Sequence, residues 1–137
     1  MGEYLRRWSG PAWTRTADFA EYERACRTAM QIPQAAFCAM ESFRWAMRSL
    51  LRLHGRRFRA HVRAPIVSPT LHLHGALDSV VLPETALGSG RYVIAAYEWR
   101  LLPDVGHFPH REAPDLVTGE IIRWMKEDPA GLPGARY

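Results

Sequence analysis

The sequence lacks long apolar runs and contains only two cysteines. No stretch approaches the roughly 20 apolar residues that a helix needs to cross a bilayer, and no apolar signal-peptide core follows the first arginines. Cys26 and Cys38 lack the spacing of metal ligands and do not form a disulfide framework. His72 and His74 alternate along one segment, but no third ligand with suitable spacing accompanies them. We therefore expect a cytoplasmic protein with no membrane span, no metal site and no cofactor.

Acidic residues are scarce in the first part of the chain. Residues 1–63 carry 12 arginines against 5 acidic residues, a balance of +7, whereas residues 64–137 carry 6 basic and 9 acidic residues, a balance of −3. The length of 137 residues fits one ordinary domain. The change of charge nevertheless indicates two parts of different character, joined near Ala64.

The first part has the spacing of helices. A turn-rich segment is expected at 8–14, where Gly10 and Pro11 interrupt any regular pattern. Apolar residues then recur at helical spacing from about 18 to 30, with Asp18 as the expected N-cap. A second helix is expected from about 34 to 54, closed by Gly55 as its C-cap.

The second part changes to an alternating pattern. A strand is expected within 65–75, followed by a helix that begins near Pro83, a second strand at about 97–102 and a loop at 103–109. A final helix is expected from about 113 to 126, with a buried stripe formed by Leu116, Val117, Ile121, Ile122, Trp124 and Met125. This order implies an α/β fold with two parallel strands and a right-handed crossover. Residues 129–137 are expected to form a tail.

Two loops carry the residues with catalytic chemistry. Asp78 follows the first expected strand and His107 follows the second. Chemistry in open parallel sheets gathers beyond the carboxyl ends of the strands, so these two side chains are expected to meet. A carboxylate there would hold the Nδ1–H form of the imidazole while Nε2 accepts a proton. Asp78 and His107 are therefore the candidate catalytic residues.

Residues 69–78, PTLHLHGALD, resemble the segment that delivers the catalytic acid in α/β-hydrolases. Residues 106–115, GHFPHREAPD, resemble the segment that delivers the histidine, especially in the epoxide-hydrolase-like branch, which often has an acidic residue at the position of Arg111. The resemblance implies a helical lid at 1–63 and the C-terminal β-α-β-α part of the hydrolase core at 64–128. It also implies hydrolysis of an ester, an epoxide or a similar small apolar substrate.

The nucleophile of that family is missing from the sequence. No G-x-S-x-G elbow or Asp-type equivalent occurs, and residues 88–90, Gly-Ser-Gly, lack both the spacing and a preceding strand. We therefore expect a truncated or split form that is inactive alone. Because two parallel strands are too few for an independent sheet, its open edge would bind a complementing N-terminal half or a second copy.

Two other functions remain open. The Arg-rich helices could make the chain a non-catalytic binding or interaction domain. Nucleic acid is not the expected partner, because the neighbouring aromatics fall on the apolar side of the helix and a solvated lid face accounts for the arginines. Alternatively, Ser68 or Ser79 could serve as an unorthodox nucleophile in a self-sufficient esterase.

Overall fold

The computed structural model describes residues 1–50 and 52–127. Its elements, in chain order, are α1 (Gly2–Trp8), η1 (Trp13–Arg15), α2 (Ala17–Gln31), α3 (Ala35–Ser49), α4 (Leu53–Val62), β1 (Thr70–Gly75), α5 (Pro83–Leu87), η2 (Gly88–Tyr92), β2 (Tyr97–Leu102), α6 (Pro109–Glu112) and α7 (Pro114–Lys126). The α/β class is confirmed. The tail expected at 129–137 lies outside the described residues.

The two strands form a parallel pair. Thr70 of β1 lies opposite Tyr97 of β2, and the register continues to Gly75 opposite Leu102. The second strand has the bounds predicted from the sequence, whereas the first begins later than 65. Pro69 has no N–H to donate to a ladder, which delays its start. Upstream, only an isolated bridge joins Ile66 to Val93.

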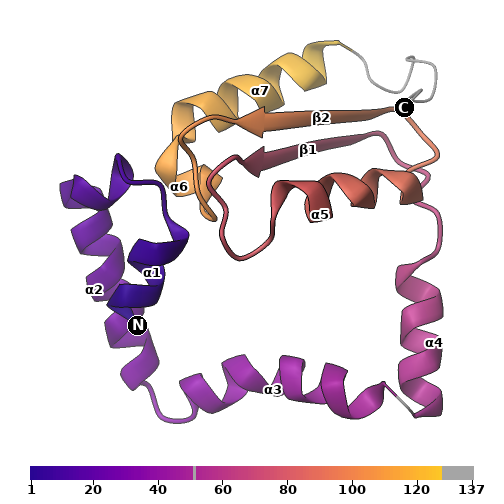
Figure 1. The fold of residues 1–137 in the computed structure, drawn as a ribbon, viewed down its shortest axis with the longest axis horizontal. Coiled ribbons are helices and arrows are strands. Elements are labelled where there is room, and N and C mark those ends of the chain that lie inside the picture. Colours follow the sequence, from indigo (N-terminus) through magenta and orange to yellow (C-terminus); the bar gives the residue numbers. More distant parts are fainter. Residues whose placement is uncertain (51, 128–137) are drawn as a thin grey trace.

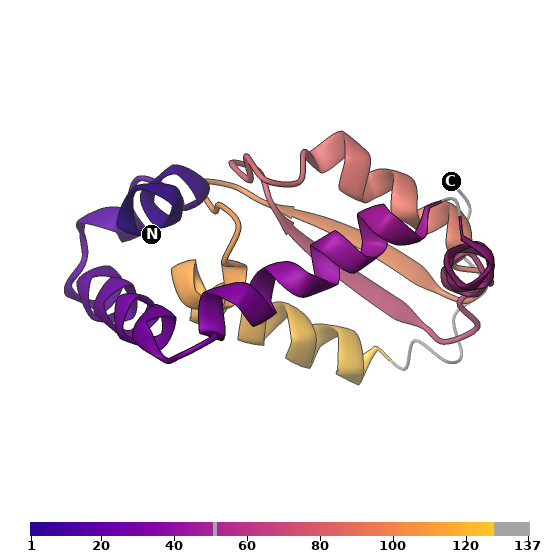
Figure 2. The same ribbon diagram turned by 90° about the horizontal axis from the view of Figure 1, so that it is seen from below.

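Helices cover the two faces of this strand pair. In Figure 1, α7 lies along one side of β1 and β2 while α5 lies along the other. α1 and α2 lie beyond the carboxyl ends of the strands, where the arrowheads point. α3 and α4 extend away as an arm, and the view from below shows α3 crossing beneath the strands (Figure 2). The carboxyl ends of the strands therefore face α1, and the arm lies apart from the sheet.

The main buried cluster joins the N-terminal helices to the loop after β2. Leu5, Trp13 and Phe19 are its buried members, and Phe108 packs against them from the second part of the chain. The ring of Trp13 lies edge-on to Phe19 with a centroid separation of 5.0 Å. The first 22 residues and the loop around Phe108 therefore pack as one unit.

The N-terminal expectations need two corrections. Residues 2–8 form helix α1, where only a turn-rich segment beginning at residue 8 was expected. The N-cap of α2 is Thr16, whose hydroxyl accepts from the main-chain nitrogen of Phe19 at 3.1 Å. Asp18 instead accepts from the indole N–H of Trp13 at 2.8 Å. The prediction of Asp18 as N-cap was wrong: the helix begins one residue earlier, at Ala17, and the carboxylate of Asp18 is held by Trp13 and Arg111.

The second predicted helix is divided into two. α3 ends at Ser49 and α4 begins at Leu53, so Gly55 lies inside a helix and is no C-cap. A side chain at Gly55 would collide with the carbonyl group of Ser49. Glycine thus permits the close approach of α4 to the end of α3, which is the physical reason for its position.

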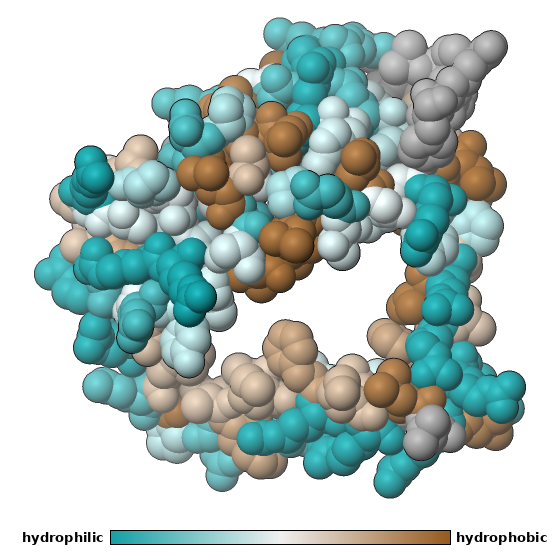
Figure 3. Space-filling model, viewed as in Figure 1, coloured by the Kyte–Doolittle hydropathy of each residue, from teal (hydrophilic) through white to brown (hydrophobic). Residues whose placement is uncertain are grey.

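The buried stripe predicted on α7 is largely exposed. Trp124 is buried and Val117 is half-buried, but the other residues of the stripe retain 42–71% of their surface exposed; they are Leu116, Ile121, Ile122 and Met125. A sheet of two strands is too narrow to cover this face. The apolar face of α3 is similarly uncovered, and the arm bounds an open space in Figure 3.

Candidate active site

The acid loop begins where β1 ends and is held against the histidine loop by main-chain hydrogen bonds. Ala76 donates to the carbonyl of Leu102 at 2.9 Å, and Leu77 donates to the carbonyl of Val105 at 2.8 Å. These bonds continue the parallel pairing beyond the strands themselves. The carboxyl ends of β1 and β2 therefore place Asp78 and its neighbours beside the loop that carries His107.

The loop after β2 approaches α1 closely. The main-chain nitrogen of His107 donates to the carbonyl of Trp8 at 2.7 Å. Any side chain at Gly106 would meet the main chain around Trp8 and Gly10, so only glycine fits there. This close contact fixes the main chain at His107 and thereby the point from which its imidazole extends.

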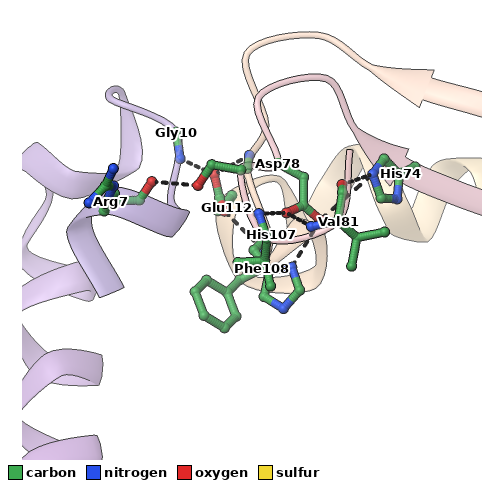
Figure 4. Close-up of polar contacts among 11 residues, drawn as sticks. Arg7, Gly10, His74, Asp78, Val81, His107, Phe108 and Glu112 are labelled. Atoms are coloured by element: carbon green, nitrogen blue, oxygen red, sulfur yellow. Dashed lines mark hydrogen bonds and ion pairs between the residues drawn. The ribbon is translucent and has the colours of Figure 1, made fainter. Parts of the chain in front are cut away.

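Glu112 reinforces the same loop from helix α6. Its carboxylate accepts from the main-chain nitrogens of Gly10 and Gly106, both at 2.7 Å, and from Phe108 at 3.0 Å (Figure 4). One charged side chain thus satisfies three N–H groups in two segments. No local pattern in the sequence marks Glu112, because a glutamate at the end of a four-residue helix has no distinctive signal.

Asp78 and His107 are brought together as predicted. The Nδ1 atom of His107 lies 2.9 Å from Oδ2 of Asp78, which is hydrogen-bonding distance (Figure 4). The other carboxylate oxygen, Oδ1, accepts from the main-chain nitrogens of Val80 at 2.8 Å and Val81 at 3.0 Å. The residue is only 6% exposed. Hydrogen-bond donors therefore hold both carboxylate oxygens of Asp78 in place.

The electrostatic environment of Asp78 favours its charged form. Burial by itself raises the pKa of the carboxyl group. The hydrogen bond from His107, those from Val81 and Val80, and the charge of His107 outweigh burial, so the pKa lies below its ordinary value. An ionised Asp78 holds the proton of His107 on Nδ1 and leaves Nε2 to accept one.

A pocket opens beside this pair. Its volume is about 340 Å³, and its lining includes His72, His74, Asp78, Val81, Ser89 and His107. The side chain of His107 keeps 32% of its surface exposed. Within residues 1–50 and 52–127, Nε2 of His107 has no hydrogen-bond partner. A substrate or a nucleophile could therefore approach that nitrogen from the pocket.

Among the described residues, the serines proposed as nucleophiles form no hydrogen bond with the imidazole of His107. The hydroxyl of Ser79 donates to the carbonyl of Arg7 at 3.0 Å. Ser68 precedes β1 and so lies at the opposite end of the strand from His107. Ser89 lines the pocket, although the described part of the chain contains no hydrogen bond between it and His107. No serine is thus paired with the candidate base.

Metal and membrane sites find no support in the described residues. Among them, no cluster of three or more His, Cys, Asp or Glu side chains could hold a metal ion. Nor does any helix they form combine the length and apolar character needed to cross a bilayer. Cys26 and Cys38 are free thiols.

The arginines of the arm differ in their partners. Arg44 and Arg48 pair with Glu41 at 3.2 and 3.0 Å. On α4, Arg56 and Arg57 are exposed and form no ion pair with any described residue. Arg111, where the epoxide-hydrolase-like branch often has an acid, instead pairs with Asp18 at 2.8 Å and stays outside the pocket.

Comparison with known proteins identifies no relative. No protein-family model matches the chain, and no curated protein or solved structure does so either.

Proposed function

We propose that this chain carries the acid and the histidine of an α/β-hydrolase-type active site, within a partial form of that fold. The hydrogen bond from Nδ1 of His107 to Oδ2 of Asp78 carries the proposal. It joins two loops at the carboxyl ends of neighbouring parallel strands, where such sheets place their chemistry. A lone surface histidine would have no buried carboxylate directed at it by two main-chain donors.

The roles of the two residues follow from this geometry. Asp78 orients the ring and stabilises the imidazolium that forms when Nε2 accepts a proton. That proton would come from a nucleophile or from the water that resolves a covalent intermediate. The adjacent pocket, about 340 Å³ with Leu73, Val81 and Ala86 among its lining, suits a small apolar ester or epoxide.

The nucleophile must come from another polypeptide segment. The sequence has no nucleophile elbow, and the serines considered above are not paired with His107. Among the described residues, no strand pairs with the other edge of β1, which offers a place for that segment. Thr70 and Ala76 direct their N–H groups towards β2. Because successive N–H groups of a strand point to opposite sides, those of Leu71, Leu73 and Gly75 point to the open edge. A strand added there would extend the sheet and cover apolar surface.

Two measurements test this function. The nucleotide sequence immediately upstream should encode a strand followed by a G-x-S-x-G or Asp-type elbow, in frame or frameshifted. The isolated chain should hydrolyse p-nitrophenyl butyrate no faster than its His107→Gln variant, and activity should appear on co-expression with the upstream polypeptide. Turnover by the isolated chain that is lost in Ser68→Ala or Ser79→Ala would instead identify a self-sufficient esterase and overturn the split-site proposal.

The unpaired arginines of α4 favour a second candidate function, a non-catalytic domain that binds an anionic partner. Nucleic acid is the partner easiest to test. Fluorescence anisotropy with a labelled duplex at 50 and 200 mM salt would show a steep loss of affinity if arginine–phosphate contacts drive binding. Absence of binding at the lower salt concentration would remove nucleic acid as the partner.

A further inference from the structure

The carboxylate of Asp78 lies between two imidazoles. Oδ2 is 2.9 Å from Nδ1 of His107 and 3.7 Å from Nε2 of His74. Only the first distance is that of a hydrogen bond. His74 directs the same Nε2 atom to the carbonyl oxygen of Val81, 3.0 Å away (Figure 4). Because a carbonyl oxygen only accepts, Nε2 of His74 must carry the proton.

His74 belongs to the rigid part of the site. It lies in β1, opposite Leu101 of β2, and its side chain is only 10% exposed. Its ring stacks on that of Trp99 with a centroid separation of 5.5 Å and an interplanar angle of 25°. The sheet, and not the acid loop, therefore sets the position of this imidazole.

Val81 connects His74 to Asp78. Its carbonyl oxygen accepts from His74, and its nitrogen donates to Oδ1 of Asp78 at 3.0 Å, beside the bond from Val80. The acid loop is thus tied back to β1 through the residue that orients the carboxylate. With Oδ1 held in this way, Oδ2 is left directed at His107.

We propose that His74 is a positioning residue for the Asp78–His107 pair. It acts through the main chain of Val81 and donates no proton to a substrate. The proposal rests on the proposed function above, and it adds a third residue on which the alignment of the base depends. If the Nε2–H donor is lost, Val81 is released, Oδ1 of Asp78 loses one of its two main-chain donors and the hydrogen bond to His107 weakens.

The length of the side chain provides matched variants. The amide nitrogen of glutamine occupies about the place of Nε2, so His74→Gln should still reach the carbonyl of Val81. The amide of asparagine is one carbon shorter, so His74→Asn remains polar but falls short. His72→Gln is the control, because His72 lies on the same strand, bonds to the hydroxyl of Tyr97 at 3.1 Å and has no hydrogen bond to Val81 or Asp78 among the described residues.

The test is nuclear magnetic resonance of the full chain labelled with ¹⁵N-histidine. The wild type should show a low-field Nδ1–H proton resonance, assigned to His107 by its loss in His107→Gln. That resonance should persist in His74→Gln and His72→Gln and be lost in His74→Asn. The ¹⁵N shifts of the wild type should also show a proton on Nε2 of His74.

The outcomes separate the two proposals. Absence of the low-field resonance from the wild type would contradict the Asp78–His107 pair and with it the proposed function. A resonance that persists in His74→Asn, or that is lost equally in His74→Gln, would overturn the proposed role of His74 and leave the Asp78–His107 pair unaffected. A His74 ring with a proton on Nδ1 and none on Nε2 in the wild type would do the same without any variant, so the test stands even if His74→Asn fails to fold.

Discussion

The main-chain nitrogen of His107 donates a hydrogen bond to the carbonyl oxygen of Trp8, at 2.7 Å. This contact joins the first helix to the loop that presents the candidate base, and Glu112 holds the same two segments together through Gly10 and Gly106. The segment predicted as a lid at 1–63 therefore contains residues that support the histidine loop directly. α3 and α4 are the parts that extend away from it.

Glu112→Gln should destabilise the chain. The carboxylate accepts three main-chain hydrogen bonds, whereas an amide is uncharged and offers only one oxygen. Hydrogen bonds to a charged group are strong, so we expect a loss of about 1–3 kcal/mol in the free energy of unfolding, measured by urea denaturation. Glu84→Gln is the control, because Glu84 is exposed on α5. Equal stability of the two variants would show that Glu112 does not hold the loop.

The stability of the chain should fall in acid partly through Asp78. Its pKa in the folded state lies below its ordinary value, so the fold favours the charged form. That contribution is present above the unfolded pKa of about 3.9 and is lost as the pH falls through the lower folded pKa. Asp78→Asn should be less stable than the wild type at pH 7, and the difference should shrink below about pH 4. Thermal melts across this range would reveal a constant difference if Asp78 were an ordinary surface carboxylate.

His72 should make the stability of the chain depend on pH in a second, higher range. Burial, and then the charge of His74, lowers its pKa, so the fold favours the neutral ring. Its contribution is present above the unfolded pKa of about 6.5 and is lost as the pH falls towards the folded pKa. We expect the wild type to lose more stability than His72→Gln between about pH 7 and pH 5. Parallel curves for the two proteins would contradict this assignment.

The open edge of β1 should be the site of association. Leu73→Pro removes an N–H group that points away from β2, so the β1–β2 pairing should survive while strand addition is blocked. Sedimentation velocity should show less self-association for this variant, and co-expression should yield less of the complex with the upstream polypeptide. The matched change His72→Pro removes an N–H on the β2 side and should disrupt the fold. Unchanged association of a folded Leu73→Pro would place the interface elsewhere.

The sequence predicted the elements whose signals are local. The alternating residues of 97–102 predicted the second strand, and the glycine–histidine pair after that strand identified His107 as a candidate catalytic residue. The pairing with Asp78 followed because parallel strands deliver their loops to one edge. Signals that depend on tertiary partners were missed. Thr16 is the N-cap in place of Asp18, whose carboxylate is held by Arg111 from the second part of the chain, and Gly55 fits inside a helix because α4 packs on Ser49.

The α7 stripe shows a different limit. Periodicity identified its apolar face correctly, but burial depends on what covers that face, and the described sheet has only two strands. Ile121 and Met125 therefore remain exposed. The contribution of His74 could not be predicted either, because its bond to Val81 depends on how the acid loop folds back onto β1.

The central claim is that this chain carries the catalytic acid and histidine. The rate at which its complex with the co-expressed upstream polypeptide hydrolyses an ester tests that claim most directly. With p-nitrophenyl butyrate as substrate, His107→Gln should lower kcat by roughly a thousandfold or more, and Asp78→Asn by a comparable factor, as removal of a triad member does elsewhere. His110→Gln, a change on the neighbouring helix α6 outside the pocket lining, should leave kcat unchanged. A complex that hydrolyses the ester equally fast without the imidazole of His107 would contradict the assignment of this chain as the carrier of the catalytic acid and histidine.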